Sequence, residues 1–589
     1  MLFRSGEARD ETVAAIREQN PNARPGPLAE ALGASGGREL DRLVAGLSAR
    51  FVPAGRGNDP LRNPDAIPTG KNFYGFDPDR IPSREAFALG RRAAEQMLAE
   101  RGGADGEPPK KVAIVLWATE TIRNQGMNES TALWLMGMRP TWDDGGRVTG
   151  VEPVPGEELG RPRVDVLINP SGLYRDLFPN MMKLLDRAVQ VASRQTDVEN
   201  LIAVNSKRLR ERLVGRGVAP ARADALSRLR VFSEKPGNYG NRVVEVTGAS
   251  GLWESDTDVS RVYERHTGYA YGGGEWGVPA RELLGDHLED VEVAAHSISS
   301  ALYGTMDNDD MFQFLGGLSL AVRNRAGESP DTVVALQRRA DEIEVEDLAR
   351  TVGRELRSRY LNPAWIEGMK DEGYAGAREL SNFVDYMWGW QVTVPDAVDD
   401  ARWNQTYEVY VEDKYDLDVK RFLDEANPWA LQSIAARMLE SARKEYWAAS
   451  DEQRERLAVE YVESVLEHGV SCSDNTCDNP LLHTEIIDLA APALDARTLE
   501  RFREVIEQAI RKTLEQQTAE LEALREELVD LFERESMPAR VDGYEMEEID
   551  RVPEVSREPL DHALWWAAAI AAAVVGLFFA GALAARRRR

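Results

Sequence analysis

The sequence has few of the residues and motifs on which many enzymes depend. It contains only two cysteines in 589 residues, which excludes a disulfide framework. Its six histidines are too few and too scattered for a histidine-rich metal enzyme. No GxxxxGK(S/T) phosphate loop occurs, so we expect no ATP hydrolysis by a P-loop mechanism. An HExxH pair is absent too.

Positive charge is also scarce. Acidic residues outnumber basic ones by 100 to 72, so the net charge is −28 and the pI is near 4.8. A surface this acidic repels polynucleotides, and we expect no nucleic-acid partner. Only 11 of the basic residues are lysines. This bias fits either adaptation to high salt or a GC-rich genome, and the sequence leaves both open.

One long apolar run stands near the C-terminus. Residues 563–585 carry no charge, and a helix of this length can span a bilayer. Trp565 and Trp566 fit an interfacial aromatic belt, and four arginines follow, so we predict a single-pass transmembrane helix with a cytoplasmic tail. Nothing at the N-terminus resembles a signal peptide. The side of the main domain therefore stays open, between a C-terminal part of a longer exported protein, which we favour, and a tail anchor.

The first half of the chain predicts an α/β layer. Short apolar runs over residues 110–119, 161–172 and 229–241 are typical of buried strands, and amphipathic helical patterns separate them. Alternating strands and helices predict a mainly parallel sheet, whose ligand crevice lies beyond the carboxyl ends of its strands. From about residue 280 the pattern is mostly helical, and residues 495–537 predict a charged stalk or a solvated helix pair.

These patterns predict a fold class and a division into domains. The fold class is α/β, with a parallel-sheet layer followed by a mostly helical region, long charged helices and one C-terminal transmembrane helix. The predicted segments are an N-terminal helical remnant (1–57), an α/β domain (58–280), a mostly helical region (281–447), a helical region with a Cys/His motif and a charged stalk (448–537), an acidic tether (538–562) and a transmembrane helix (563–585).

Polar and aromatic residues recur in the loops that follow the three predicted strands. These loops offer Glu120, Arg123, Asn124 and Glu129; Ser171, Tyr174, Arg175 and Asp176; and Lys235, Asn238 and Tyr239. Such a mixture suits a large, flat, partly charged ligand. For any one of these residues an ordinary capping or turn role is the alternative.

An acidic cluster meets aromatic residues and glycines in DNDDMFQFLGG, residues 307–317. One interpretation is a helix N-terminus, with Asp307, Asn308 or Asp309 as the cap. The other is a carboxylate group that binds a divalent ion transiently or accepts protons. The sequence alone does not decide between them.

Both cysteines and two histidines fall within sixteen residues. His468, Cys472, Cys477 and His483 predict a metal site, although a C-x₄-C spacing is not a standard zinc finger. A disulfide between the cysteines and two free thiols are the alternatives.

A series of stretches in order along residues 58–447 resembles the CobN/magnesium-chelatase H family. They are PTGKNFYGFDPDRIPS, VAIVLWATETIRNQG, EELGRPRVDVLINPSGLYRDLFPN, EKPGNYG, GYAYG, DNDDMFQFLGG, RSRYLNPAWIEGMKDEGYAGARELSNFVDYMWGW and NPWALQSIAARMLESARKEYW. The DDxFQFxGG and NPWAL forms are more similar to cobaltochelatase. The cysteine pair and the C-terminal apolar run resemble a membrane-attached subgroup, and family members are longer than this chain.

The resemblance implies the large subunit of an ATP-dependent metal chelatase, which inserts a divalent metal, most often cobalt but also magnesium or iron, into a tetrapyrrole. AAA+ partners would hydrolyse ATP, and a separate N-terminal portion of the subunit is a further expected partner. Asp309, Asp310, Gln313 and Glu129 are the implied catalytic residues, and Tyr239, Arg175, Tyr174 and Phe312 the implied tetrapyrrole-binding residues. A membrane-attached dechelatase and a non-catalytic tetrapyrrole or metal carrier are the alternatives.

Overall fold

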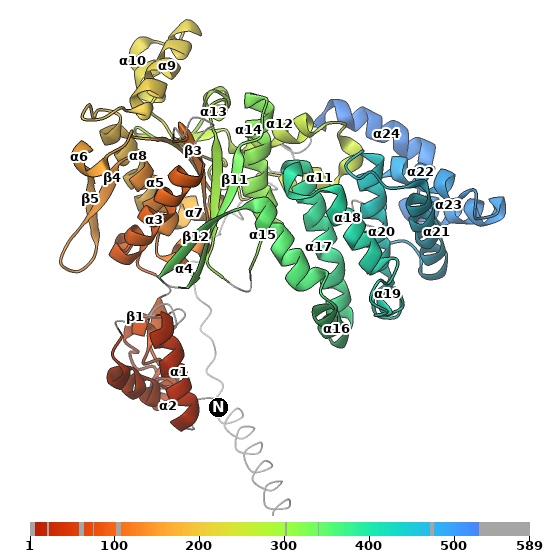
Figure 1. Cartoon of the computed structure of the whole chain (residues 1–589), viewed down its shortest axis with the longest axis horizontal. Helices are drawn as coiled ribbons and strands as arrows, with labels where there is room; N and C mark the ends of the chain where they lie inside the picture. The colour runs from red at the N-terminus through yellow and green to blue at the C-terminus, as the bar shows by residue number, and fades with distance from the viewer. Residues whose placement is uncertain are drawn as a thin grey trace, which may run out of the picture. The chain divides into compact units, whose positions relative to one another are not determined.

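The computed structural model describes residues 6–19, 23–57, 60, 64–74, 76–101, 108–300, 303–339, 341–471 and 476–528 (Figure 1). The chain divides into two compact units, residues 1–536 and 537–589, and all described residues belong to the first. The finer domain boundaries stay a prediction.

The central element is an eight-stranded sheet. Its strands, in spatial order, are β12 (Glu342–Asp347), β11 (Asp331–Arg339), β10 (Val293–Ile298), β3 (Lys111–Leu116), β6 (Asp165–Pro170), β7 (Val231–Ser233), β8 (Tyr269–Gly272) and β9 (Glu275–Pro279). The five strands from β11 to β7 are parallel, whereas β12, β8 and β9 are antiparallel. The predicted parallel layer is present, and β3, β6 and β7 lie within the three predicted strand segments.

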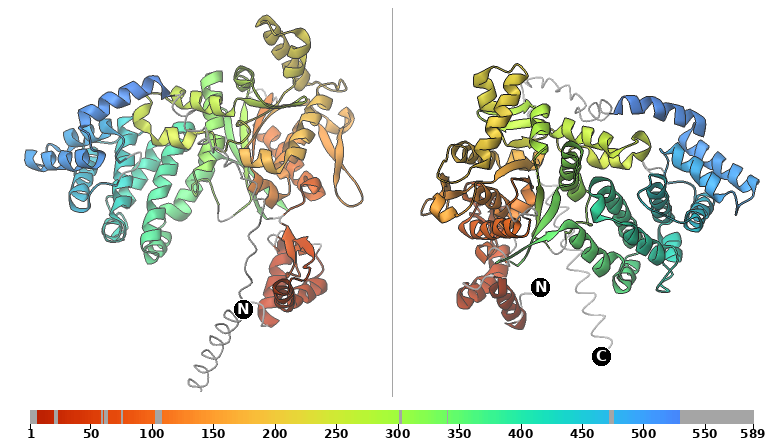
Figure 2. Two further views of the ribbon diagram at one scale, coloured as in Figure 1. Left: turned by 180° about the vertical axis from the view of Figure 1, so that it is seen from behind. Right: turned by 45° about the horizontal axis from the view of Figure 1, so that its top comes forward.

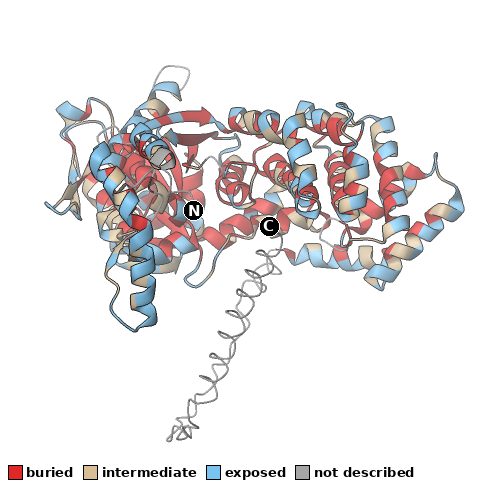
Figure 3. Ribbon diagram, turned by 90° about the horizontal axis from the view of Figure 1, so that it is seen from below, coloured by how far each residue is buried: buried red, intermediate tan, exposed pale blue. Residues whose placement is uncertain are grey.

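Alternate residues of each strand belong to two different cores, because successive side chains of a strand point to opposite faces. Val112, Ile114 and Leu116 face one core, whereas Ala113 and Val115 face the other. The first core is covered by α3 (Arg84–Glu100), α5 (Met127–Leu135) and α8 (Pro179–Ala192), and the second by α12 (Asp256–Thr267), α13 (Arg281–Leu288) and α14 (Gly317–Ala326). Figure 3 shows the buried residues along the strands and on the inner sides of the helices.

Three strands lie where the sequence predicts mostly helices. β10, β11 and β12 follow residue 281 and extend the sheet beyond β3. The strand β10 reads VAAHSI, and His296 and Ser297 interrupt the apolar run that marks a buried strand. Both side chains are nevertheless buried, so tertiary contacts compensate for their polarity.

The second core continues without a break into a helical region. The helices are α15 (Leu348–Glu355), α16 (Pro363–Asp371), α17 (Tyr374–Thr393), α18 (Asp400–Tyr410), α19 (Val419–Ala426), α20 (Pro428–Arg443), α21 (Asp451–His468), α22 (Pro480–Ala490), α23 (Ala496–Ile510) and α24 (Leu514–Glu526). They pack side by side (Figure 2). Within the predicted charged run, α23 and α24 are separate helices, each with buried apolar residues, and they pack on α21 and α22.

The other described elements are shorter or lie outside the two large cores. They are α1 (Gly6–Gln19), α2 (Pro25–Leu47), β1 (Ala54–Arg56), β2 (Asn72–Tyr74), α4 (Ala118–Asn124), β4 (Met138–Trp142), β5 (Val148–Pro153), α6 (Gly156–Leu159), α7 (Gly172–Leu177), α9 (Leu201–Gly215), α10 (Pro220–Leu226) and α11 (Val243–Gly248). The helices α1 and α2 share a small apolar core of their own, as the sequence predicts for a helical N-terminal segment.

The predicted fold class needs one correction, which concerns the transmembrane helix and the membrane location. No helix of the described residues is long and apolar enough to cross a bilayer. The longest, α2 and α17, have 23 and 20 residues, but charged residues interrupt both. Residues 563–585 themselves lie outside the described residues. The fold of the described residues is therefore mixed α/β and mostly helical, without a membrane span.

Candidate functional site

The candidate site lies at the carboxyl ends of the central strands. From β3 the chain proceeds to β6 on one side, and it later returns to β10 on the other side of β3. This reversal of strand order opens a crevice outside the strand ends, where α/β sheets bind ligands. The loops after β3, β6, β7 and β10 all reach this edge, and the fourth of them carries the DNDD segment.

Half of the DNDD segment has a structural role. Asp307 accepts hydrogen bonds from Arg359 (2.5 Å) and from the Tyr360 hydroxyl (2.7 Å). The side chain of Asn308 accepts from the backbone N–H of Met311 at 3.2 Å, so Asn308 caps the following helix. The capping interpretation is thus correct for Asn308 and leaves Asp309 and Asp310 to be explained.

Asp309 and Asp310 form a pair of carboxylates at the rim of the site. Asp310 keeps an exposed face, but the protein around it and the charge of Asp309 raise its pKa, while Gln313 donates to it at 3.0 Å. Burial raises the pKa of Tyr386 to about 12, and Asp309 contributes to the increase. Burial, Asp310 and Asp309 also raise the pKa of Tyr303. Two tyrosines therefore lie close enough to the carboxylate pair for its charge to raise their pKa.

The FQFLG residues after this pair form a π-helix, Phe312–Gly316, which leads into α14. Its phenylalanines are buried, and Phe312 packs against Gly389 and Trp390 of α17. A Cβ on Gly316 would lie 2.4 Å from Thr393, and one on Gly317 would lie 2.7 Å from Tyr263. The glycine pair therefore allows the helix to pack closely against α17 and α12.

Gln313 links the acidic segment to the loop after β7. Its Oε1 accepts the backbone N–H of Asn241 at 3.1 Å, and its backbone carbonyl accepts from the Asn241 side chain at 2.8 Å. Gly240 has a φ of +84°, and a Cβ there would approach Gln313 Oε1 to 3.0 Å. Gln313 thus fixes the end of the loop that carries Tyr239.

Arg175 holds the same loop from the side of α7. Its side chain is fully buried, and its guanidinium donates to the carbonyls of Glu234 (3.0 Å), Lys235 (2.9 Å) and Asn238 (3.3 Å). It also pairs with Asp176 at 2.8 Å, and Asp176 accepts from the Tyr239 hydroxyl at 2.7 Å. The ring of Tyr239, which is 61% exposed, is thereby presented at the sheet edge.

We expect Arg175→Met to lower the free energy of unfolding by about 2 to 3 kcal/mol, because three carbonyls lose a charged donor. Arg175→Lys should recover little of this loss, since a lysine cannot match the guanidinium fork. Urea denaturation measures both values, and Arg187→Met, at an exposed arginine, is the control. A stable Arg175→Met protein with an unchanged transition would contradict the clamp.

Glu129 and Tyr174 lie deeper in the protein than Tyr239 and the carboxylate pair. Neither side chain is exposed, and Glu129 Oε1 accepts from the Tyr174 hydroxyl (2.9 Å) and from Thr121 (2.7 Å). Burial raises the pKa of Glu129, and its Oε2 has no hydrogen-bond partner among the described residues. This carboxyl joins α5 to α7 behind the loops.

The sequence did not indicate Glu234, a buried carboxyl below the loop that carries Tyr239. Its Oε2 accepts from Ser233 at 2.7 Å, and its Oε1 has no partner among the described side chains and backbone groups. Burial raises its pKa to about 7.

This shift predicts a pH-dependent stability. The folded protein binds the Glu234 proton more tightly than the unfolded chain, so the contribution to stability is fully present near pH 4.5 and is lost as the pH rises through 7. In Glu234→Gln, we expect the fall in unfolding free energy between pH 5 and pH 8 to be about 2.5 kcal/mol smaller than in the wild type. Glu282→Gln, at an exposed carboxylate, should leave the fall unchanged. Equal pH profiles for wild type and Glu234→Gln would contradict this assignment.

The structure brings the predicted catalytic and tetrapyrrole-binding residues to one edge of the sheet. Contacts run from Glu129 through Tyr174 and Arg175 to the loop with Tyr239, and from there to Gln313 and Asp310. The sequence did not single out Asn241, Tyr303, Tyr386, Glu234 or His296. Recognising β10 as a strand would have pointed to His296 and to the segment that follows it.

The Cys/His group lies apart, at α21 and α22. His468 pairs with Asp424 at 2.9 Å, and His483 is buried with Nε2 2.8 Å from the Thr476 carbonyl. Cys477 is disulfide-bonded, as one of the alternatives requires, whereas Cys472 lies outside the described residues. Within the described ranges, no group of three or more His, Cys, Asp or Glu side chains is arranged to hold a metal.

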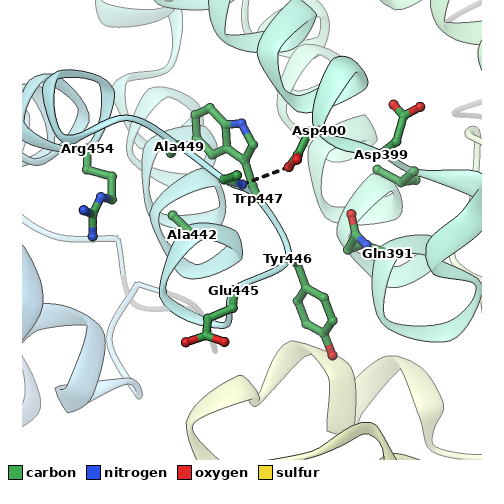
Figure 4. A pocket seen from close by; sticks show the side chains of 11 residues that line it. Gln391, Asp399, Asp400, Ala442, Glu445, Tyr446, Trp447, Ala449 and Arg454 are labelled. Atoms are coloured by element: carbon green, nitrogen blue, oxygen red, sulfur yellow. Dashed lines mark hydrogen bonds between the residues drawn. The ribbon is translucent and has the colours of Figure 1, made fainter.

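A separate pocket of about 420 Å³ lies between helices of the second half (Figure 4). Gln391, Asp400, Glu445, Tyr446 and Arg454 are among its lining residues. The Asp400 carboxylate accepts a hydrogen bond from the backbone N–H of Ala448 at 2.8 Å, so this lining residue already has a structural role. None of the predicted site residues lines this pocket.

Comparisons with known proteins agree with the resemblance. A family model described as CobN/Magnesium Chelatase matches residues 5–454. The aerobic cobaltochelatase subunit CobN of Pseudomonas aeruginosa is 35% identical over 436 residues, which are 73% of this chain and 34% of that protein. The H subunit of the magnesium chelatase of Chlorobaculum parvum is 32% identical over 428 residues, 72% of this chain and 33% of that protein.

A solved structure is similar as well. The catalytic subunit of cobaltochelatase from Mycobacterium tuberculosis superposes with a TM-score of 0.66 at 31% sequence identity, covering 78% of this chain and 39% of that one. The chain spans about a third of the length of the curated relatives. A membrane-attached subgroup finds no support in these comparisons.

Proposed function

Because the chain belongs to the CobN/magnesium chelatase family, we propose that it is the tetrapyrrole-binding large subunit of a metal chelatase. The observation that carries this proposal is the edge of the sheet where Gln313 links the carboxylate pair of Asp309 and Asp310 to the loop that exposes the ring of Tyr239. A flat ring needs an apolar platform, and α7, whose Gly172 lies close to the Tyr239 ring, adds the exposed apolar side chains of Leu173 and Leu177.

Metal insertion has simple chemical requirements. The ring must lose two pyrrolic protons, and the ion must exchange bound water for ring nitrogens. Asp309 and Asp310 can accept the protons, and hard carboxylate oxygens can also bind the arriving ion. The raised pKa of Asp310 makes it a better proton acceptor than an ordinary aspartate. We assign Glu129 and Arg175 to positioning, since both are fully buried and hold α7 and the Tyr239 loop.

Energy must come from elsewhere, because the sequence has no P-loop. We assign ATP hydrolysis to separate AAA+ subunits, as the family resemblance implies. Cobalt is the first candidate for the metal, since the DDxFQFxGG and NPWAL forms are more similar to cobaltochelatase, and magnesium is the second.

Reconstitution tests the proposal. The full chain is mixed with the ATPase subunits of an aerobic cobaltochelatase, a tetrapyrrole and either Co²⁺ or Mg²⁺, and metal insertion is followed by absorbance. We expect ATP-dependent insertion that requires this chain and that is faster with Co²⁺. Ring binding without insertion would support a carrier instead, and the absence of ring binding would overturn the proposal.

A further inference from the structure

His296 is the last polar side chain of β10 on the face that packs against the helical layer. β10 lies beside β3 at the point where the strand order reverses, and the segment after it leads to the DNDD residues. The imidazole is 1% exposed, and its ring centroid is 4.3 Å from that of Trp117 at the end of β3. Trp117 in turn contacts Phe314 of the π-helix at 5.9 Å between centroids.

The hydrogen bonds of His296 fix its tautomer. Nδ1 lies 3.1 Å from the carbonyl oxygen of Val115, which can only accept, so Nδ1 carries the proton. Nε2 therefore has a lone pair, and it has no partner among the described residues. Burial lowers the pKa of the imidazole to about 4, so the ring is neutral at physiological pH.

This arrangement is the one that metal-binding histidines adopt. Such a histidine usually donates its other ring N–H to a backbone carbonyl or a carboxylate, which fixes the ring and leaves a lone pair for the metal. A free metal ion would need further ligands, which the surrounding described residues do not offer. A metal inside a tetrapyrrole already has four ring nitrogens, so a single axial histidine completes a five-coordinate site.

We propose that His296 is an axial ligand of the metal in the bound tetrapyrrole, through Nε2; this inference rests on the proposed function. Trp117 covers the imidazole, and its indole N–H also has no partner among the described residues. No hydrogen bond of the indole N–H to a described residue would have to break for the ring to turn aside. Coordination then uses the Nε2 lone pair and releases no proton.

Electron paramagnetic resonance of the full chain with cobalt(II) mesoporphyrin tests the assignment. One axial nitrogen splits the high-field cobalt lines into triplets. We expect triplets in the wild type and in His468→Ala, whose imidazole pairs with Asp424. His296→Ala should lose the triplets and regain them with added imidazole. His296→Gln, which can still donate to Val115 but has no imidazole lone pair, serves if the alanine variant does not fold.

The outcomes separate the two proposals. Porphyrin that binds the wild type without triplets, or triplets that persist in His296→Ala, would overturn the axial ligand and leave the chelatase proposal intact. Porphyrin that fails to shift its Soret band with the wild type would overturn the proposed function itself.

Discussion

Asp309→Asn is expected to slow metal insertion by about 10²- to 10⁴-fold, the range that a positioned proton acceptor contributes. The substitution keeps the size of the side chain and removes its charge and basicity. Among the described residues, Asp309 has no side-chain partner comparable to the Arg359 and Tyr360 contacts of Asp307, so we expect little change in stability. Tetrapyrrole affinity should also be nearly unchanged.

Asp307→Asn is the matched comparison within the same segment. Because Asp307 pairs with Arg359 and Tyr360, its substitution should lower the thermal stability and change the insertion rate much less. Insertion is followed by absorbance in the reconstituted system, and ring binding by fluorescence quenching. An Asp309→Asn protein with wild-type insertion, or one that no longer binds the ring, would contradict the assigned role.

Asp165→Asn is expected to lower the free energy of unfolding by about 3 to 5 kcal/mol, the cost of leaving buried charges without their partner. Asp165 lies at the amino end of β6, and its side chain is fully buried. It accepts from Arg230 at 2.7 Å and lies 3.6 Å from Lys111, and both of these side chains are also fully buried. Burial already lowers the pKa of Lys111 to about 7.

Urea denaturation measures the expected loss for Asp165→Asn. A lower midpoint with an unchanged m-value would show that the substitution lowers the stability of the native state. The control is Asp224→Asn, whose carboxylate is 46% exposed and pairs with Arg228; an exposed ion pair contributes at most about 1 kcal/mol. The buried cluster of Asp165, Arg230 and Lys111 lies at the amino ends of the strands, opposite the candidate site. Asp165→Asn should therefore leave tetrapyrrole affinity unchanged at temperatures where the protein is folded. If Asp165→Asn lowers the free energy of unfolding by less than about 1 kcal/mol, water or another group must solvate the buried charges of Lys111 and Arg230, and the assigned role of Asp165 would be wrong.

The sequence and the structure agree where a local pattern was sufficient. β3 and β6 are unbroken apolar runs after polar residues, and such runs predict buried strands without knowledge of their neighbours. β10 was missed because His296 and Ser297 make it locally unlike a buried strand. Only its position between β11 and β3 explains why those polar residues are buried there.

The role of each acidic residue could not be read from the segment itself. Asp307 and Asp309 have the same chemistry two positions apart, yet Asp307 is bound by Arg359 and Tyr360, which lie 52 and 53 residues further along the chain. Gln313 contacts Asn241 across 72 residues. Arg175 appears in the sequence as a polar loop residue, whereas the fold buries it against carbonyls about 60 residues away.

By itself, the sequence determined the family, the parallel layer, and the loops that meet at one edge of the sheet, because these depend on composition, periodicity and motifs that are local in the chain. The tertiary structure decided which carboxylate of the acidic segment is bound by distant side chains, which arginine is a buried clamp, and which histidine keeps a lone pair. The physical reason is that burial and hydrogen-bond partners set the charge and reactivity of a side chain, and the fold supplies both from distant parts of the chain.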